Sequence, residues 1–122
     1  MKASEFRIGN IIYNKEQKKE HIVTLETLIK ISEGKAQAHL SYLEITEDLL
    51  KKLGAEKICR DVISLGSNYV WTIMDIILFK DYGTWYLMKE GEWCLERERE
   101  LKYFHELQNL YFALNEKELN LM

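Results

Sequence analysis

Residues 68–96 read "NYVWTIMDIILFKDYGTWYLMKEGEWCLE", in which three stretches rich in β-branched and aromatic residues are separated by "KDYG" and "KEG". Both separators are good turn sequences, so the segment predicts an antiparallel meander. The run "DIILF" lacks strict alternation, which indicates a strand that is covered on both faces. A helix must then cover part of this sheet, and the segment near the C-terminus is the obvious candidate. The chain of 122 residues is predicted to form a single α+β domain over residues 1–122.

Two helices are expected beside this sheet, at about residues 46–53 and 103–114. In the first, Thr46 is a natural N-cap, acidic residues occupy the first turn and basic residues the last, and Gly54 can end the helix. In the second, apolar residues at helical spacing predict a buried face. This face consists of Tyr103, Phe104, Leu107, Leu110, Tyr111 and Leu114.

The opposite arc of the C-terminal helix is almost uncharged. An ordinary surface helix presents Lys and Glu on such an arc, whereas this one carries amide, aromatic and imidazole side chains. We therefore expect the arc to be covered as well, either by the chain itself or by a partner such as a second copy. The candidate partner-contact residues are His105, Gln108, Asn109 and Phe112.

The stretches "FRIGNIIY" (residues 6–13) and "EHIVTLETLIKIS" (residues 20–32) are rich in β-branched residues and are joined by a charged loop. They predict an N-terminal β-hairpin, whose first strand resembles the opening strand of small SH3-like barrels. The pair Gly9-Asn10 indicates a bulge or tight bend in that strand. The β-branched content of the second stretch favours a strand, but a helical period also fits its apolar residues Ile22, Leu25, Leu28 and Ile31.

The chain lacks a recognisable catalytic set. His21 and His39 have no second histidine or carboxylate at metal-ligand spacing. His105-Glu106 resembles the start of a zinc-protease helix, but the position of the second histidine holds Asn109, a poor zinc ligand. Asp75 lies within an apolar run, where a functional carboxylate can occur, although such a residue more often faces solvent. We therefore predict no catalytic residue, no cofactor and no metal ion.

Composition argues against two classes of function. The formal net charge is −3 and neither half of the chain is basic, so we expect no general nucleic-acid binding. No apolar run approaches the roughly 20 residues that span a bilayer, and the first residues contain no apolar signal core. Cys59 and Cys94 lack the spacing of a metal site and are expected to be buried, reduced core residues, which favours a cytoplasmic location.

Aromatic residues are concentrated in the meander. They could form an exposed surface that stacks bases or anchors a partner, but few cations are interleaved, so we expect them to form cross-strand core contacts. The charged run "ERERELK" that follows (residues 96–102) is expected to be a solvated connector. The aromatic residues are Tyr69, Trp71, Tyr82, Trp85, Tyr86 and Trp93.

Three motifs, "FRIGNIIY", "LEITEDLLKKLGAEK" and "LKYFHELQNLYFALNEKEL", occur in this order. They resemble those of a family of short uncharacterised bacterial proteins that are typical of genomes with many mobile elements and prophages. The resemblance covers most of the chain and implies no activity, cofactor or catalytic residue, because none is assigned to that family. One departure is Asn115-Glu116, where the resemblance implies a Thr-Gly stop after the helix.

These observations favour a small non-enzymatic module that binds a protein partner or itself, and the resemblance implies a mobile-element origin. One alternative is a nucleic-acid-associated accessory protein of a phage or mobile element, which the acidic charge disfavours. A second alternative is an enzyme with a site near Asp75, His39 or His105. It fails if none of these three residues lies in a pocket.

Overall fold

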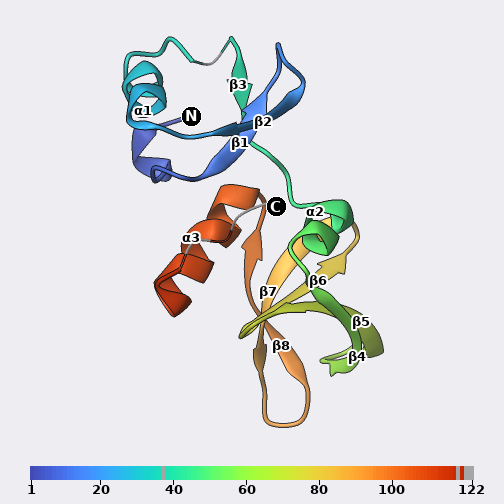
Figure 1. Ribbon diagram of the computed structural model, residues 1–122. Helices are drawn as coiled ribbons and strands as arrows, with labels where there is room; N and C mark the ends of the chain where they lie inside the picture. Colours follow the sequence, from blue (N-terminus) through green and yellow to red (C-terminus); the bar gives the residue numbers. More distant parts are fainter. Residues whose placement is uncertain (37, 118, 120–122) are drawn as a thin grey trace. The chain divides into compact units, whose positions relative to one another are not determined.

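The computed structural model describes residues 1–36, 38–117 and 119, and the chain forms two compact units. Met1–Glu44 and Tyr103–Leu119 make up the first, called here the N-terminal unit, and Ile45–Lys102 make up the second, called the barrel unit. Figure 1 shows helices around a small sheet in the first unit and a strongly curled sheet in the second. The predicted α+β fold is confirmed. None of the helices in the described residues is long and apolar enough to cross a bilayer.

The N-terminal unit contains a three-stranded sheet of order β2-β1-β3. Its strands are β1 (Ile11–Asn14), β2 (Lys19–Ile22) and β3 (Leu40–Ser41), and both pairings are antiparallel. The 3-10 helix η1 (Ala3–Glu5) precedes β1, α1 (Leu25–Ser32) follows β2, and α3 (Phe104–Asn115) packs against β1. An apolar core lies among these elements and consists of Phe6, Ile12, Val23, Ile31, Ala36 and Leu40.

The predicted hairpin is present, but both of its stretches differ from the prediction. Strand β1 begins only at Ile11, because Arg7–Asn10 form a tight turn in which Gly9 has a φ of 97°. Residues 25–32 form helix α1, so the prediction of a strand there is wrong, and the described residues contain three α-helices instead of the predicted two.

The capping of α1 explains why a helix forms in place of a strand. Thr24 Oγ1 accepts a hydrogen bond from the Thr27 N–H, and Thr27 Oγ1 accepts one from the Thr24 N–H, each at 3.2 Å. Glu26 and Lys30 add an i,i+4 ion pair at 3.4 Å. This reciprocal capping supplies hydrogen-bond partners for backbone N–H groups that have none at the start of a helix. Its stabilisation of the helix outweighs the preference of the β-branched residues for a strand.

The bounds of the two predicted helices are confirmed to within one or two residues. The predicted buried face of the second helix is wrong at Leu114, which exposes 56% of its surface because the helix also buries His105 and Gln108. Helix α2 (Glu47–Lys52) begins at Thr46, whose Oγ1 accepts a hydrogen bond from the Leu49 N–H at 3.2 Å. Helix α3 ends at Asn115, and the next residue, Glu116, has a φ of 55°. This left-handed position favours glycine. It is the position at which the family resemblance implies a glycine.

The barrel unit is an antiparallel meander, as predicted, of five strands in the order β4-β5-β6-β7-β8. One parallel pair, Val62 with Leu95, joins the first strand to the last and closes the barrel. The N-terminal hairpin is not part of this barrel, since β1 and β2 belong to the other sheet. The strands are β4 (Glu56–Val62), β5 (Gly66–Ile73), β6 (Ile76–Asp81), β7 (Thr84–Glu90) and β8 (Leu95–Leu101).

Strand β6 is buried on both faces, as its unbroken apolar run predicts. Phe79 lies in the barrel interior, in a cluster with Val62, Val70, Met88 and Leu95. On the other face Ile76 and Leu78 are completely buried. The expected covering helix, α3, belongs to the N-terminal unit, where it packs against β1. Within the barrel unit, the Trp85 indole Nε1 donates to the carbonyl of Ile45, just before α2, at 3.0 Å.

Three local predictions for the barrel unit are wrong. The run 68–79 is interrupted by the turn Met74-Asp75, so Asp75 is an exposed turn residue and not a strand residue. Met74 takes the positive φ of 53° that a two-residue hairpin turn needs, and without glycine the turn has no sequence signal. Cys59 is exposed and Cys94 is only half-buried, so neither is the buried core residue that the sequence predicts. In β4, Cys59 lies on the face opposite to the buried Val62 and the half-buried Ile58.

The run "ERERELK" is also not a connector, because most of it forms β8. This strand pairs with β7 along its length, whereas its only pair with β4 is at Leu95. Beyond Leu95, the side of β8 that faces away from β7 has no strand partner among the described residues. Alternating charges protect such an edge from pairing with other chains, which accounts for a strand of this composition.

Candidate functional site

The amide side chains of α3 connect this helix to the chain segment Arg7–Ile11. Gln108 is completely buried, and its Oε1 accepts a hydrogen bond from the Ile11 N–H at 2.7 Å. Its Nε2 donates to the carbonyl of Leu119 at 2.9 Å and to that of Gly9 at 3.4 Å. Both ends of this buried amide have partners, as burial of a polar group requires.

Asn109 and Phe112 contact Arg7 on the same side of the helix. Asn109 Oδ1 accepts hydrogen bonds from Arg7 Nε and from Asn10 Nδ2, each at 2.8 Å. The Arg7 guanidinium lies over the Phe112 ring, 4.3 Å from its centroid, in a cation–π contact. Phe112 still exposes 38% of its surface.

His105 lies in an aromatic cluster of the N-terminal unit. Its ring centroid is 4.5 Å from that of Phe6 and 5.6 Å from that of Tyr42, and it is also stacked near Tyr103. The Nδ1 atom is buried and has no hydrogen-bond partner in the part of the chain that the structure describes. Burial lowers the pKa of His105, although the carboxylates of Glu106 and Glu5 act in the opposite direction. The neutral imidazole is therefore the favoured form.

The chain itself thus covers three of the four residues named as partner contacts. The sequence leaves open whether the chain itself or a partner covers these residues. For His105, Gln108 and Asn109, the chain itself provides the contacts. Contact with a partner stays a prediction, and Phe112 has the most exposed surface of the four.

A hollow of about 270 Å³ lies beside α1 in the N-terminal unit. It brings His21, from β2, together with His39, which immediately precedes β3. Ala36 and Leu40 are the apolar residues that line it, and the rest of the lining is polar. The polar lining includes two lysines, two glutamates and two threonines, namely Lys30, Lys35, Glu16, Glu26, Thr24 and Thr27.

Both histidines of the hollow have side-chain partners. His39 Nδ1 lies 2.6 Å from Glu16 Oε1. His21 Nε2 lies 3.0 Å from the hydroxyl of Thr27, a residue that is almost completely buried. A carboxylate that holds one ring nitrogen orients an imidazole and leaves its second nitrogen available for another contact. The Glu16–His39 pair has this arrangement at the border of the hollow.

Sequence spacing does not predict the hollow, because it depends on the pairing of β1 with β3. Asn14 pairs with Leu40, and the Lys15 N–H donates to the His39 carbonyl at 2.7 Å, which places His39 beside the start of the β1–β2 loop. Of the three residues named for an enzymatic site, His39 lines this hollow, whereas Asp75 and His105 do not. Among the described residues, no group of three or more His, Cys, Asp or Glu side chains could hold a metal ion.

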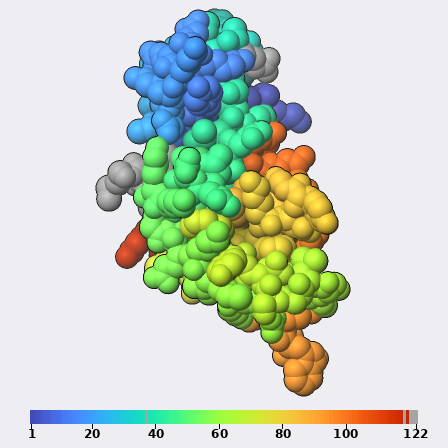
Figure 2. Space-filling model, turned by 90° about the vertical axis from the view of Figure 1, so that its right-hand side faces the viewer, coloured from blue at the N-terminus to red at the C-terminus, as the bar shows by residue number. Residues whose placement is uncertain are grey.

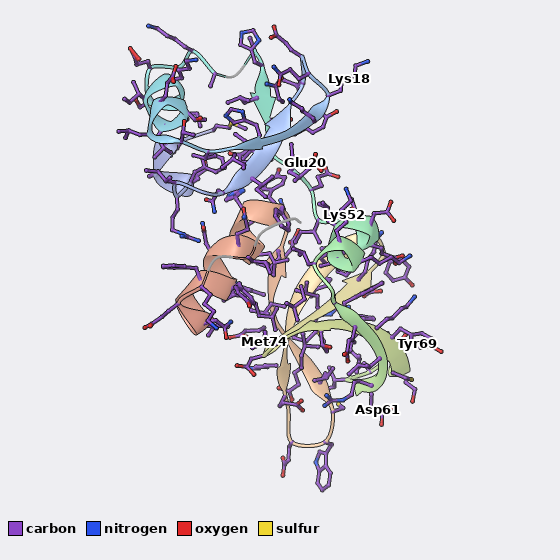
Figure 3. The ribbon with its side chains drawn as sticks, viewed as in Figure 1. Lys18, Glu20, Lys52, Asp61, Tyr69 and Met74 are labelled. Carbon is purple, nitrogen blue, oxygen red and sulfur yellow. The ribbon has the colours of Figure 1, made fainter. Side chains whose placement is uncertain are left out.

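The aromatic residues of the meander form two groups. Trp71 and Trp85 are buried, as predicted, and Tyr86 is half-buried beneath the guanidinium of Arg97. The prediction of core contacts is wrong for the other three, which are largely exposed. These are Tyr69 at 63%, Tyr82 at 100% and Trp93 at 88%. Tyr69 is labelled on the outer side of the barrel in Figure 3.

Trp93 lies in the turn Gly91–Cys94, which joins β7 to β8. The Gly91 N–H donates to the Cys94 carbonyl at 2.9 Å and closes the turn. A Cβ at Gly91 would lie 2.5 Å from that carbonyl oxygen and 2.8 Å from the Glu96 side chain, so the turn has no room for one. This hairpin, coloured orange, projects from the rest of the barrel unit in Figures 1 and 2. Trp93 is therefore carried on a turn whose backbone atoms are closely packed.

Comparisons with family models, with curated proteins and with solved structures found no match to this chain.

Proposed function

We propose that the protein is an interaction module whose barrel unit binds a separate protein through the β7–β8 hairpin. The observation that carries this proposal is Trp93, which exposes 88% of its surface in the turn of that hairpin. A tryptophan in this position contributes little to the core of the barrel. At protein interfaces, in contrast, tryptophan is one of the residue types that contribute most binding energy.

The rigidity of the turn supports a binding role for Trp93. The Gly91–Cys94 hydrogen bond and the lack of space at Gly91 restrict the backbone on which Trp93 is carried. A turn whose backbone is already restricted loses less conformational entropy when it binds a partner. The hairpin is therefore suited to insertion into a concave surface.

The charge of the hairpin indicates the chemistry of the partner. Residues 90–96 contain three glutamates and no basic residue. Glu90 is paired with Arg60 at 2.8 Å, while Glu92 is exposed and Glu96 half-buried. An apolar pocket rimmed by Lys or Arg would complement Trp93 and these carboxylates. Two copies of the chain would bring like charges together at this hairpin, so we propose a basic protein partner in place of a second copy.

A selection from a random-peptide phage library tests the proposal. The wild-type protein is immobilised, and enriched peptides are then measured for binding to the wild type, to Trp93→Ser and to Tyr82→Ser. Tyr82→Ser is the matched control, because it removes a fully exposed aromatic residue from the β6–β7 hairpin of the same barrel. We expect enriched peptides to contain basic and apolar residues and to lose at least about tenfold in affinity with Trp93→Ser, as for truncation of an interface hot spot.

Two results would contradict the proposal. Enriched peptides that bind Trp93→Ser as tightly as the wild type would show that the hairpin is not the binding surface. Analytical ultracentrifugation supplies the other: a wild-type dimer that Trp93→Ser abolishes would make a second copy the occupant of this surface. The expected result is a monomer whose sedimentation is unchanged by the substitution.

A further inference from the structure

The hollow of the N-terminal unit is independent of the β7–β8 hairpin and has a different chemistry. Its volume of about 270 Å³ lies just below the roughly 300–1,000 Å³ typical of pockets for drug-sized ligands. It therefore has room for a small metabolite and not for a peptide or a folded partner. Ala36 and Leu40 supply its apolar lining, so a ligand would be held chiefly by polar contacts.

The carboxylates of the lining already have cationic or hydrogen-bonding partners. Glu16 Oε1 lies 2.6 Å from His39 Nδ1, and Glu26 Oε1 lies 3.4 Å from Lys30 Nζ. Lys30 and Lys35 balance these two carboxylates in formal charge, and Lys35 also contacts the carboxylate of Glu33 at 3.4 Å.

In this lining, the hydrogen-bond donors of the two lysines nevertheless exceed the acceptors that contact them. An ammonium group has three N–H donors and no acceptor, and Lys30 and Lys35 each contact a single carboxylate, at 3.4 Å. Asn14 Oδ1 accepts from the backbone N–H groups of Glu16 and Gln17, at 3.0 Å each, which leaves its amide Nδ2 to donate. A ligand that fits this lining must therefore be rich in acceptors.

The two lysines are placed close together by the end of α1. The Lys35 N–H donates to the Lys30 carbonyl at 2.9 Å, so the two side chains start from neighbouring backbone positions. Their ion pairs with Glu26 and Glu33 are largely exposed, and exposed pairs of this kind contribute little free energy. An incoming anion can therefore exchange these partners at low cost.

We propose that this hollow binds a small anionic molecule through a phosphate or carboxylate group, with Lys30 and Lys35 as the binding groups. Both anions present several acceptor oxygens to ammonium donors, which form the stronger, charge-assisted class of hydrogen bond. Thr24 and Asn14 border the same hollow and can bind the uncharged, hydroxyl-bearing part of such a ligand.

Titration of the ¹⁵N-labelled protein with inorganic phosphate, with acetate and with chloride at matched ionic strength tests this inference. We expect phosphate, acetate or both to produce saturable shifts of backbone amides in residues 14–16, 24–30 and 38–40, and chloride to produce none. Saturation by phosphate alone assigns a tetrahedral oxyanion, and saturation by acetate as well assigns the carboxylate class. Shifts that do not exceed those caused by chloride would overturn the inference.

Charge-matched variants separate a built site from a general effect of positive charge. The double variant Lys30→Gln and Lys35→Gln is expected to weaken the binding of the effective anion by about tenfold or more, since charge-assisted hydrogen bonds are lost. Lys89→Gln removes an exposed lysine from the barrel unit and is expected to leave the affinity unchanged. Equal affinities for the wild type and the double variant, with the spectra otherwise intact, would refute the assigned binding groups.

Discussion

The two units of this protein are stabilised by different kinds of interior. The four polar residues that are buried in the described part of the chain, Asn10, Thr27, His105 and Gln108, all belong to the N-terminal unit. The interior of the barrel unit is a cluster of five apolar side chains, with Phe79 the largest of them. The same chain therefore uses a hydrogen-bonded interior in one unit and an apolar interior in the other.

The difference follows from how each sheet satisfies its backbone. In the barrel, β5, β6 and β7 each pair with a strand on both sides, so few of their backbone groups need side-chain partners. The N-terminal unit is assembled from two distant parts of the chain around short strands. Buried groups such as the Ile11 N–H find their partner in a side chain, here that of Gln108. Polar side chains thus join segments that strand pairing does not.

The first prediction concerns a substitution in the apolar interior of the barrel unit. Phe79→Ala removes an aromatic ring that is 5% exposed and should destabilise the barrel unit by about 3–5 kcal/mol, from lost burial and the cavity left behind. All three tryptophans of the chain lie in this unit, so tryptophan fluorescence during denaturation reports on it alone. Tyr82→Ala, at a fully exposed aromatic residue, is the control and should leave the transition unchanged. Equal effects of the two substitutions would contradict an interior built around Phe79.

The second prediction concerns a substitution in the polar interior of the N-terminal unit. Gln108→Leu keeps the volume of the side chain but leaves the Ile11 N–H and the Leu119 carbonyl without their partner. We expect the N-terminal unit to lose about 1–3 kcal/mol for each buried group that stays unsatisfied. Hydrogen exchange of the β1 amides, Ile11–Asn14, measures the change, while the fluorescence transition of the barrel should move little. Gln17→Leu, at an exposed glutamine, is the control, and a loss of protection as large as that of Gln108→Leu would refute the role of the buried amide.

Sequence reasoning succeeded where the decisive interactions are local. Helix α2 is specified by its own cap at Thr46 and by Gly54 beyond its end, so its bounds were predicted closely. The cap of α1, Thr24, is equally local and a helical period fits its apolar residues, but the β-branched content favours a strand in the sequence. The turn at Met74-Asp75 was missed for a related reason, since its left-handed residue is a methionine inside an apolar run.

The candidate sites depend on pairings that are distant in sequence, and they were predicted less well. The unusual amides of α3 were singled out, but their partners Arg7 and Ile11 lie almost a whole chain length away, and nothing in the helix itself identifies them. The hollow arises only when β3 pairs with β1 and brings His39 beside the β1–β2 loop. Polar residues at one site are thus visible in the sequence individually, whereas their assembly is a property of the fold.

The two interiors should also differ in their response to pH. The polar interior contains His105, which can be protonated, whereas the apolar interior of the barrel does not respond to protonation. The groups that face it are Glu5, Tyr42, Tyr103 and Glu106. Burial and the hydrogen bond to Glu5 raise the pKa of Tyr42 to about 12, so this hydroxyl stays protonated and donates to Glu5 at 2.7 Å. His105 is therefore the member of the cluster that is expected to change its charge between about pH 8 and about pH 5.

The last prediction concerns the direction of that change. Burial lowers the pKa of His105 in the folded state, so the stability it contributes is complete above the ordinary histidine pKa of about 6.5 and is lost as the pH falls below it. Protection of the β1 amides should therefore decrease as the pH falls from about 8 to about 5. The exchange rates are first corrected for the intrinsic effect of pH. His105→Phe keeps a ring among Phe6, Tyr42 and Tyr103 but cannot be protonated, and it should reduce this pH dependence. An identical pH dependence in wild type and variant would show that His105 is not the source of the effect.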